Sequence, residues 1–381
     1  MSGKFYARCI AGANSFRILL VLASIYCLRK QTEAEENEKD ELPSAQTRIH
    51  SMPRFVVIAF LSALVFSPLT VSAQDKDDSM KFRMVIHGGA GTIERSEMTP
   101  QNEEAHRAGL EQSLNAGYDV LARGGSSLDA VEAAIRILEN NPLFNAGKGA
   151  VFTHEGTNEL DASIMDGRTL KAGAVAELKQ IRNPISLARL VMEKSPHVML
   201  AGDGAEAFAK KMGITFVDQK YFYTDQRWQE LQKEKAKSGS GKEKDRHGTV
   251  GAVALDKAGN LAAGTSTGGT TNKEFGRIGD SPVIGAGTYA NDQTCAVSCT
   301  GDGEYFIRAA VAHDVSAMME YKKMSVKDAA QAAIDKVARL GGTGGLIALD
   351  RDGNFAMPFN TSGMYRGSIG PNGKVMVEIY R

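Results

Sequence analysis

The chain has no excess of charge of either sign and little tryptophan or proline. Its 381 residues include 45 lysines and arginines against 45 aspartates and glutamates, so the formal net charge is zero. A neutral chain provides no basic field that would favour nucleic acid and no acidic field that would attract cationic partners. The length and apolar content allow one large domain or two ordinary ones, with a real core.

Cysteines are few, and their positions predict no disulfide. Cys9 and Cys27 lie in a segment that we expect to be absent from the mature protein. Cys295 and Cys299 stand four apart in an apolar run typical of a strand, where an extended chain separates their Cα atoms by about 13 Å. That separation is too long for a disulfide. We therefore expect both residues to be buried thiols.

Metal-ligand and phosphate-binding patterns are also missing. The histidines are scattered, and no two of them stand at zinc-site spacing with cysteines or carboxylates. Gly88-Gly89-Ala90-Gly91 follows a predicted strand, but neither a P-loop lysine nor Gly-x-Gly-x-x-Gly spacing accompanies it. These absences exclude a nucleotide cradle, whereas a hard cation held by loop carbonyls would leave no side-chain pattern.

Residues 1–51 lack the pattern of a folded domain, and residues 52–73 have that of a secretory signal. A positively charged start precedes the apolar residues 55–66, and Val71-Ser72-Ala73 gives a small-x-small cleavage site. We interpret 1–51 as an over-extended translation start and expect the mature chain to begin near Gln74. The alternative is an uncleaved membrane anchor, for which the apolar run is short. A signal peptide predicts export, with the periplasm as the destination.

The rest of the chain alternates helical and strand patterns. Apolar residues at three-to-four spacing predict helices at 100–122, 127–140, 183–193, 205–212, 304–321 and 325–340. Strands are predicted at 82–87, 151–153, 160–166, 172–177, 250–256, 261–265, 283–286, 296–299, 345–350, 355–359, 364–370 and 374–380. Helices grouped between antiparallel-type hairpins predict an α+β fold with helices on the outer faces of sheets.

A charged segment meets a buried strand at Gly248-Thr249. Residues 218–248 are charged and poor in apolar residues, and the chain then turns at once to Val-Gly-Ala-Val-Ala-Leu. If cleavage freed Thr249, its hydroxyl could act as a nucleophile with its own α-amine as the general base. Thr249 could instead be simply the first β-branched residue of a strand, and three stretches that follow decide between the two interpretations.

The first stretch is Thr265-Ser266-Thr267-Gly268-Gly269, at the end of the next strand. A hairpin about residues 257–260 would return this end close to Thr249. Hydroxyl groups there could orient the nucleophile and move its proton. Taken alone, the stretch is equally a threonine-rich strand end closed by a glycine turn.

The second stretch is a glycine-framed loop that places Arg277 three residues before Asp280. A guanidinium suits a substrate carboxylate and a carboxylate suits an ammonium, so the pair fits the two charges of an amino-acid head group. The alternative is a surface ion pair of little energetic value.

The third stretch is a strand-to-helix turn at Thr300-Gly301-Asp302-Gly303. Such a turn exposes backbone N–H groups, which with the Thr300 hydroxyl can form an oxyanion hole. A helix N-cap by Thr300 or Asp302 is the other interpretation, and it is compatible with that role.

With these stretches in this order, the chain resembles the plant-type L-asparaginase / isoaspartyl peptidase family of N-terminal-nucleophile hydrolases. The resemblance extends from Ile86-His87-Gly88-Gly89-Ala90-Gly91 to Pro358-Phe359-Asn360-Thr361-Ser362-Gly363 and beyond. It implies a four-layer αββα sandwich made as a precursor that cleaves itself at Gly248–Thr249. The products would be an α subunit (74–248, with 218–248 as the cleavable linker) and a β subunit (249–381), paired as an (αβ)2 heterotetramer.

The resemblance also implies roles for individual residues. Thr249 would attack the substrate carbonyl and Thr267 would hold the nucleophile, with Asn145 nearby. The oxyanion would be bound by Thr300 and the Gly301 N–H, the α-carboxylate by Arg277, and the α-ammonium by Asp280 and the Gly303 carbonyl. No cofactor is implied for the chemistry. A structural sodium ion would be held by the backbone carbonyls of Leu138, Glu139, Asn141, Phe144, Ala146 and Lys148.

The implied activity is hydrolysis of β-aspartyl dipeptides and of the side-chain amide of L-asparagine. These small molecules would be its partners, with no nucleic acid and no stable membrane association after signal removal. One alternative is a glycosylasparaginase, which has the same fold and nucleophile. Another is an exported amino-acid-binding protein that grips its ligand through Arg277 and Asp280 without cleaving itself. The motif set favours the isoaspartyl peptidase branch over both.

Overall fold

The computed structural model describes residues 81–237 and 248–381. The chain divides into two units, residues 1–74 and 75–381, and every described residue lies in the second. The expected over-extended start and signal peptide therefore fall outside the described residues. Within the part that is described, no helix is long and apolar enough to cross a membrane.

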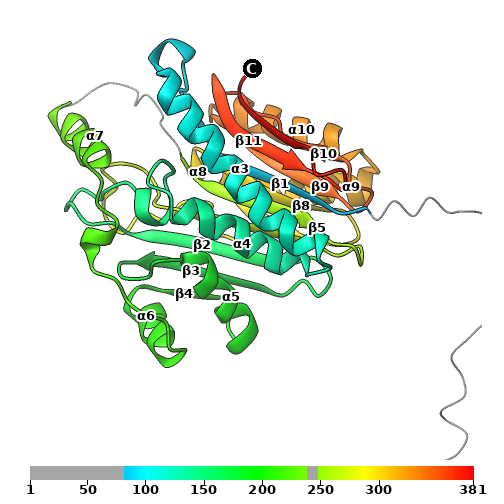
Figure 1. Ribbon diagram of the computed structural model, residues 1–381, viewed down its shortest axis with the longest axis horizontal. Helices are drawn as coiled ribbons and strands as arrows, with labels where there is room; N and C mark the ends of the chain where they lie inside the picture. Colours follow the sequence, from blue (N-terminus) through cyan, green and yellow to red (C-terminus); the bar gives the residue numbers. More distant parts are fainter. Residues whose placement is uncertain (1–80, 238–247) are drawn as a thin grey trace, which may run out of the picture. The chain divides into compact units, whose positions relative to one another are not determined.

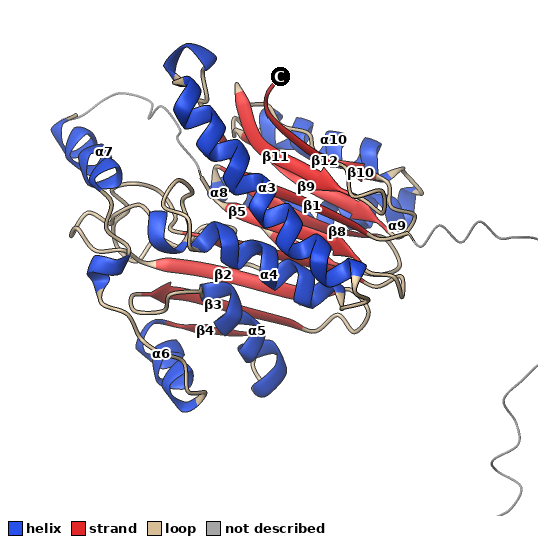
Figure 2. Ribbon diagram, viewed as in Figure 1, coloured by secondary structure: helices blue, strands red, loops and turns tan. Residues whose placement is uncertain are grey.

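An eight-stranded sheet forms the centre of the described unit (Figures 1 and 2). Its order is β12-β11-β1-β5-β6-β2-β3-β4, and all neighbours are antiparallel except β3 and β4. The strands are β1 (Arg83–Gly91), β2 (Leu160–Asp166), β3 (Ala172–Leu178), β4 (Met199–Ala201), β5 (Val250–Leu255), β6 (Leu261–Thr267), β11 (Gly363–Ile369) and β12 (Val375–Tyr380).

A smaller antiparallel sheet, in the order β10-β9-β8-β7, packs on one face of the larger one. Its strands are β7 (Thr288–Ala290), β8 (Cys295–Gly301), β9 (Gly344–Asp350) and β10 (Phe355–Ala356). Apolar side chains from both sheets form a shared core, including Val253 and Leu255 from the large sheet and Ile347 and Leu349 from the small one.

Helices cover the outer faces of both sheets. On the large sheet lie α3 (Pro100–Ala122), α4 (Ser127–Glu139), α5 (Pro184–Lys194) and α6 (Gly202–Lys211). On the small sheet lie α8 (Gly303–Ala309), α9 (Val311–Lys322) and α10 (Val326–Arg339). The remaining elements are α7 (Asp225–Ala236) and the short 3-10 helices η2 (Arg95–Glu97), η3 (Gly147–Gly149) and η4 (Gln219–Tyr221). The structure thus confirms a mixed α+β fold with helices outside.

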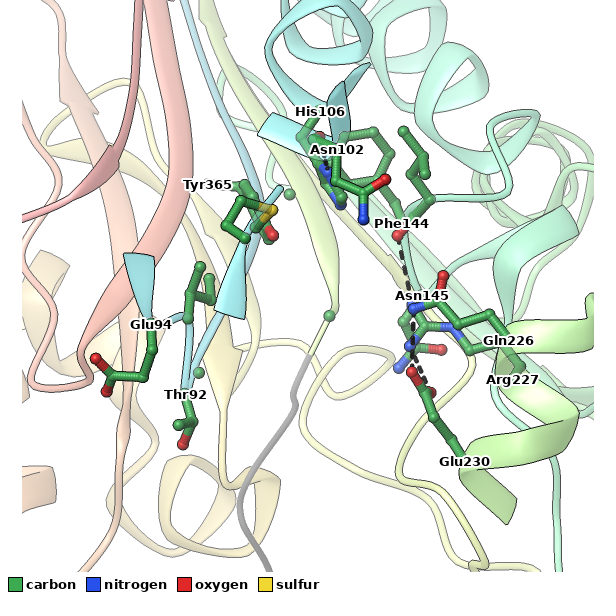
Figure 3. A pocket seen from close by; sticks show the side chains of 16 residues that line it. Thr92, Glu94, Asn102, His106, Phe144, Asn145, Gln226, Arg227, Glu230 and Tyr365 are labelled. Carbon is green, nitrogen blue, oxygen red and sulfur yellow. Dashed lines mark hydrogen bonds and ion pairs between the residues drawn. The ribbon is translucent and has the colours of Figure 1, made fainter. Parts of the chain in front are cut away.

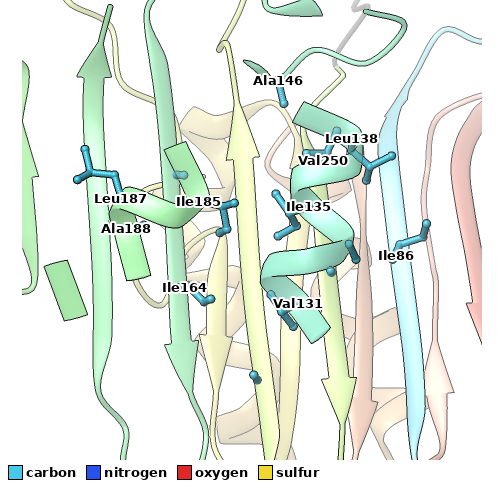
Figure 4. Packing of buried hydrophobic residues seen from close by; sticks show 14 of the residues in the cluster. Ile86, Val131, Ile135, Leu138, Ala146, Ile164, Ile185, Leu187, Ala188 and Val250 are labelled. Atoms are coloured by element: carbon cyan, nitrogen blue, oxygen red, sulfur yellow. The ribbon is translucent and has the colours of Figure 1, made fainter. Parts of the chain in front are cut away.

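Local sequence accounts for α4, the helix that precedes the loop carrying Asn145. The α4 helix begins after Ser126, whose hydroxyl accepts a hydrogen bond from the Asp129 N–H. Val131, Ile135 and Leu138 then stand at three-to-four spacing and point into the large sheet (Figure 4). This packing fixes the end of α4, from which the loop carrying Asn145 departs.

The segment expected to be a cleavable linker, residues 218–248, contains helices that the sequence pattern did not predict. Its described part holds η4 and α7 rather than irregular chain. The α7 helix begins after Thr224, which accepts from the Arg227 N–H, and it buries Arg227 and Leu231 one turn apart. The remaining faces of α7 are charged, so the sequence did not show this amphipathic pattern clearly enough to predict the helix. Residues 238–247 lie outside the described part.

Two other expectations are corrected around β7. Residues 283–286 form turns, with Val283 donating to the Asp280 carbonyl and Gly285 at a φ of 91°, and the strand follows at Thr288–Ala290. The predicted helix 304–321 breaks at Ala310, which adopts the left-handed conformation. The break allows the first N–H groups of α9 to donate to the carbonyls of Gly285 and Ala286.

Candidate active site

Thr249 lies immediately before β5, which is the first strand of the described range 248–381 and belongs to the large sheet. The predicted β5–β6 hairpin forms, with Val250 opposite Ser266. It places the Thr249 Oγ1 3.0 Å from the Thr267 Oγ1. Both residues are buried, with 7% and 2% of their surface exposed. The hairpin therefore brings two hydroxyl groups into hydrogen-bond contact next to the Gly248–Thr249 bond.

Asn145 reaches the same point from the loop between α4 and η3. Its Nδ2 donates to the Gly269 carbonyl over 2.7 Å, and its Oδ1 accepts from the Val151 N–H over 3.0 Å. A Cβ placed on Gly248 would lie only 2.6 Å from the Asn145 Cβ. Asn145 therefore packs directly against the residue that precedes Thr249, and only glycine leaves it room.

Sequence reasoning missed His87, whose ring contacts Thr249. Its Nδ1 donates to the Thr249 carbonyl over 3.0 Å, and its Nε2 lies 2.9 Å from the Ser298 hydroxyl. Complete burial lowers the pKa of His87 to about 3, against the opposing effect of the bond to Thr249. The ring is thus neutral, and the Ser298 hydroxyl donates to its Nε2. A polar residue directly after the apolar run Met84-Val85-Ile86 was the available signal.

The His87 ring ends a chain of buried hydroxyl groups between the two sheets. Between hydroxyl oxygens, Ser298 lies 2.7 Å from Thr265, Thr265 lies 2.6 Å from Thr288, and Ser163 lies 2.7 Å from Thr288. All four hydroxyl residues are fully buried. Because buried hydroxyl groups that lose a partner are costly, this chain constrains where the Thr249 carbonyl can lie.

The predicted head-group residues come together around Gly303. A Cβ on Gly303 would lie 3.0 Å from both the Arg277 Nη2 and the Asp280 Oδ1. Arg277 also forms two hydrogen bonds to Glu304, of 2.9 and 3.0 Å. Burial alone would lower the pKa of Arg277, but the Glu304 carboxylate, together with the charges of Asp280 and Asp161, outweighs it and the pKa is raised. Glu304 was not among the predicted site residues.

Asp161 connects the two groups of residues. It stands opposite Thr267 in the β2–β6 ladder, and its Oδ1 accepts from the Glu177 N–H over 2.9 Å. Its Oδ2 is buried without a hydrogen-bond partner. Burial raises the pKa of Asp161, while Lys273 and Arg277 act in the opposite direction. Asp161 therefore stands beside Thr267 and also feels the charge of the predicted head-group residue Arg277.

Thr300 and Gly301 end β8, two and three residues after Ser298. Residues i and i+2 of a strand share a face, so Thr300 faces the large sheet as Ser298 does. Its Oγ1 accepts from the Ala90 N–H over 3.2 Å. Gly301 has a φ of 145°, and a Cβ there would overlap the Thr343 carbonyl oxygen. Position 301 therefore requires glycine. Asp302 occupies the N-cap position of α8 without a side-chain cap bond.

The loop after α4 turns carbonyl oxygens toward two glycines. A Cβ on Gly147 would overlap the Glu139 carbonyl oxygen, and a Cβ on Gly149 would overlap that of Phe144. Some of the carbonyls predicted to bind sodium also accept hydrogen bonds from backbone N–H groups; the Ala146 carbonyl, for example, accepts from the Gly149 N–H. Each carbonyl has two lone pairs, so these bonds leave room for a cation. Among the described residues, no group of three or more His, Cys, Asp or Glu side chains could hold a metal ion.

Known proteins match this chain over most of its length. The family model described as "Asparaginase" matches residues 80–378. "Isoaspartyl peptidase" of Escherichia coli (strain K12) is 54% identical over 292 residues, covering 74% of this chain and 91% of that protein. "Probable isoaspartyl peptidase/L-asparaginase 2" of Arabidopsis thaliana is 44% identical over 324 residues, covering 78% and 98%. "Isoaspartyl peptidase/L-asparaginase" of Mus musculus is 44% identical over 299 residues, covering 78% and 90%. With its threonine pair, buried histidine and Arg277–Asp280 pair in one fold, this chain belongs to the asparaginase family.

Proposed function

We propose that this chain is an isoaspartyl peptidase and L-asparaginase with Thr249 as its nucleophile. The observation that carries the proposal is the 3.0 Å contact between the Thr249 and Thr267 hydroxyl groups, beside the Gly248–Thr249 bond. The names of relatives from bacteria, plants and mammals agree with this activity. No observation favours glycosyl-asparagine as the substrate.

The first chemical step is cleavage of the chain itself. The Thr249 hydroxyl attacks the Gly248 carbonyl carbon, the C–N bond breaks, and the acyl group moves to Oγ1 as an ester. Water then hydrolyses this ester, which leaves a carboxylate on Gly248 and a free α-amine on Thr249. Close packing of Asn145 against Gly248 supports this step, because it restricts the peptide at the bond that breaks.

Substrate hydrolysis then uses the freed amine as the general base. An ordinary α-amine has a pKa of about 7.7–8, which suits proton transfer near neutral pH. The amine takes the proton of the Thr249 hydroxyl as Oγ1 attacks the β-carbonyl, and Thr267 holds Oγ1 in place. Thr300 and the Gly301 N–H stabilise the oxyanion. The leaving amine departs with the proton, and water releases L-aspartate from Thr249.

Arg277 and Asp280 select the aspartyl head group. The planar guanidinium binds the α-carboxylate, and the Asp280 carboxylate with the Gly303 carbonyl binds the α-ammonium. Their convergence around Gly303 supports this assignment. The Arg277–Glu304 ion pair occupies part of the guanidinium, so substrate binding must share it or displace Glu304.

Several broader features complete the proposal. The two sheets and their outer helices would form the four-layer αββα sandwich of N-terminal-nucleophile hydrolases, assembled as an (αβ)2 heterotetramer. A sodium ion would be held by carbonyls of the loop 138–148, where it would fix the loop that carries Asn145 and take no part in the reaction. Export to the periplasm through residues 52–73 is also proposed.

The decisive experiment compares the purified protein with a Thr249→Ala variant by intact mass and denaturing gel. We expect two fragments from the unaltered protein, the second beginning at Thr249, and one intact chain from the variant. The cleaved protein should release aspartate from both L-asparagine and β-aspartyl-leucine. An unaltered protein that stays whole through long incubation would contradict the mechanism and leave an amino-acid-binding protein.

A further inference from the structure

Glu139 carries a fully buried carboxylate at the end of α4, and the proposed reaction does not use this side chain. Its Oε1 accepts from the Ser266 hydroxyl over 2.7 Å and from the Ile185 N–H over 3.0 Å. Its Oε2 accepts from the Asn183 Nδ2 over 3.0 Å. The proposed sodium site involves only the backbone carbonyl of Glu139. Because burying a carboxylate costs free energy that an apolar side chain would not, packing alone does not explain a glutamate at this position.

Two of the three donors to Glu139 belong to the start of α5. Asn183 is the N-cap residue of this helix, and Ile185 lies in its first turn. A carboxylate at a helix N-terminus satisfies N–H groups that have no partner within the helix, and it interacts favourably with the helix dipole. These two bonds explain how Glu139 stabilises α5, but they do not explain its bond to the large sheet.

The third donor, Ser266, lies in β6 directly before Thr267. It stands opposite Val250, the residue of β5 that follows Thr249. Side chains alternate between the two faces of a sheet, so Ser266 faces α4 and Thr267 faces the small sheet. The bond to Glu139 therefore holds β6 from its outer face, at the point where its inner face presents the Thr267 hydroxyl.

The loop that follows Glu139 returns to the same end of β6. Within this loop, the Asn145 carbonyl accepts from the Gly268 N–H over 3.2 Å, and the Asn145 Nδ2 donates to the Gly269 carbonyl over 2.7 Å. The Gly269 N–H in turn donates to the Thr267 Oγ1 over 2.9 Å. Hydrogen bonds and covalent chain thus form a closed cycle that runs from Glu139 through the end of β6 to Asn145 and back.

Two members of this cycle contact the bond that would be cleaved. The Thr267 Oγ1 lies 3.0 Å from the Thr249 Oγ1. Asn145 packs against Gly248, and both residues line the cavity of about 220 Å³ shown in Figure 3. A shift of β6 relative to α4 would change both contacts at once. Displacement of reacting groups by about 1 Å can lower a rate by roughly a hundredfold.

We propose that Glu139 is a positioning residue for both reactions at Thr249, because its bond to Ser266 fixes the end of β6 that carries Thr267. The inference rests on the proposed function and adds to it a side chain on the opposite face of the sheet. Loss of this bond should lower kcat and the rate of chain cleavage, since both depend on the contact between the two threonine hydroxyl groups. KM should change little, because the head-group residues lie further along the chain, between β6 and β7.

The test removes one hydrogen bond to Glu139 at a time. Ser266→Ala deletes the bond to β6, and Asn183→Ala deletes a bond to α5, so each variant leaves the carboxylate with two donors. We expect Ser266→Ala to lower both kcat for L-asparagine and the cleavage rate by about tenfold, with KM within about twofold of the wild type. Asn183→Ala is the matched control and should keep both rates within about twofold, because its loss affects α5 and not β6.

Ser266→Cys keeps a weaker donor of similar size, so both of its rates should lie between those of Ser266→Ala and the wild type. This variant also provides the measurement if Ser266→Ala does not fold. Equal loss of rate in Ser266→Ala and Asn183→Ala would overturn the proposal, since Glu139 would then act only on stability. Wild-type rates in the Ser266 variants, or a change confined to KM, would overturn it as well. Failure of the proposed function is distinct, because the wild type itself would then neither cleave nor release aspartate.

Discussion

The buried imidazole of His87 connects the Thr249 carbonyl to the hydroxyl chain between the sheets. In the folded protein its pKa is about 3, whereas its ordinary value is 6.5. Between these pH values the unfolded state binds more protons than the folded state, so stability rises with pH and is lost as the pH falls below about 6.5. Charging this ring in the folded state would also remove the acceptor for Ser298.

This residue gives a prediction on acid stability. Between pH 7 and pH 5, the shift at His87 should remove about 2 kcal/mol from the free energy of unfolding. His87→Gln removes the titrating ring. Between pH 7 and pH 5 the free energy of unfolding of this variant, measured in urea, should therefore fall by about 2 kcal/mol less than that of the wild type. Ser298→Ala deletes one partner but keeps the buried ring and should retain the wild-type slope. Equal slopes for wild type and His87→Gln would contradict the prediction.

At the scale of residues, the sequence predicted which side chains lie together where both belong to one hairpin or one loop. The pairing of Thr249 with Thr267 followed from one hairpin, and Arg277 with Asp280 from one loop. His87 was not predicted, because its role depends on contact with β8, which lies 211 positions away at Ser298. Glu304 was missed for the same reason, since only the fold brings it to Arg277.

At the scale of elements, the success of prediction depended on whether the signal was local. The α3 helix runs over the predicted residues because Thr99 caps it and Pro100 opens it. The α7 helix escaped prediction because its few buried residues depend on distant partners, such as the bond from Arg227 to the Gly149 carbonyl. The break between α8 and α9 likewise has no local signal, since Ala310 adopts φ 48° and ψ 49° to serve contacts with the loop before β7.

Because Ala310 adopts the left-handed conformation at the break between α8 and α9, we predict that Ala310→Gly stabilises the protein. Ala310 is exposed, so the change leaves no cavity, and glycine adopts the left-handed conformation without the steric cost of a Cβ. After subtracting the greater chain entropy of glycine in the unfolded state, we expect a gain of about 0.5–1 kcal/mol in urea unfolding. Ala317→Gly, inside α9, should instead lose about 1 kcal/mol. A loss of similar size at both positions would show that Ala310 carries no strain.

At the scale of the whole described unit, the position of Gly248–Thr249 in the sheet order determines what cleavage does. Strands from both sides of this bond alternate in the large sheet, where β1 lies between β11 and β5, and β6 lies beside β2. Three antiparallel ladders, β1–β11, β1–β5 and β2–β6, therefore join the two sides. The helices α3 and α4, from before the bond, also pack on strands that come after it.

This interleaving predicts that the two fragments stay together after cleavage at Gly248–Thr249. Their separation would expose β1, β5, β6 and β11, which are buried along nearly their whole length, and would leave long unpaired strand edges. Size-exclusion chromatography in native buffer should show one peak that contains both fragments, at the elution volume of the uncleaved Thr249→Ala variant. Urea should release both fragments in the same transition that unfolds the protein, because neither piece retains a complete sheet. Fragments that elute apart in native buffer would mean that the ladders across the cleavage site do not hold the enzyme together.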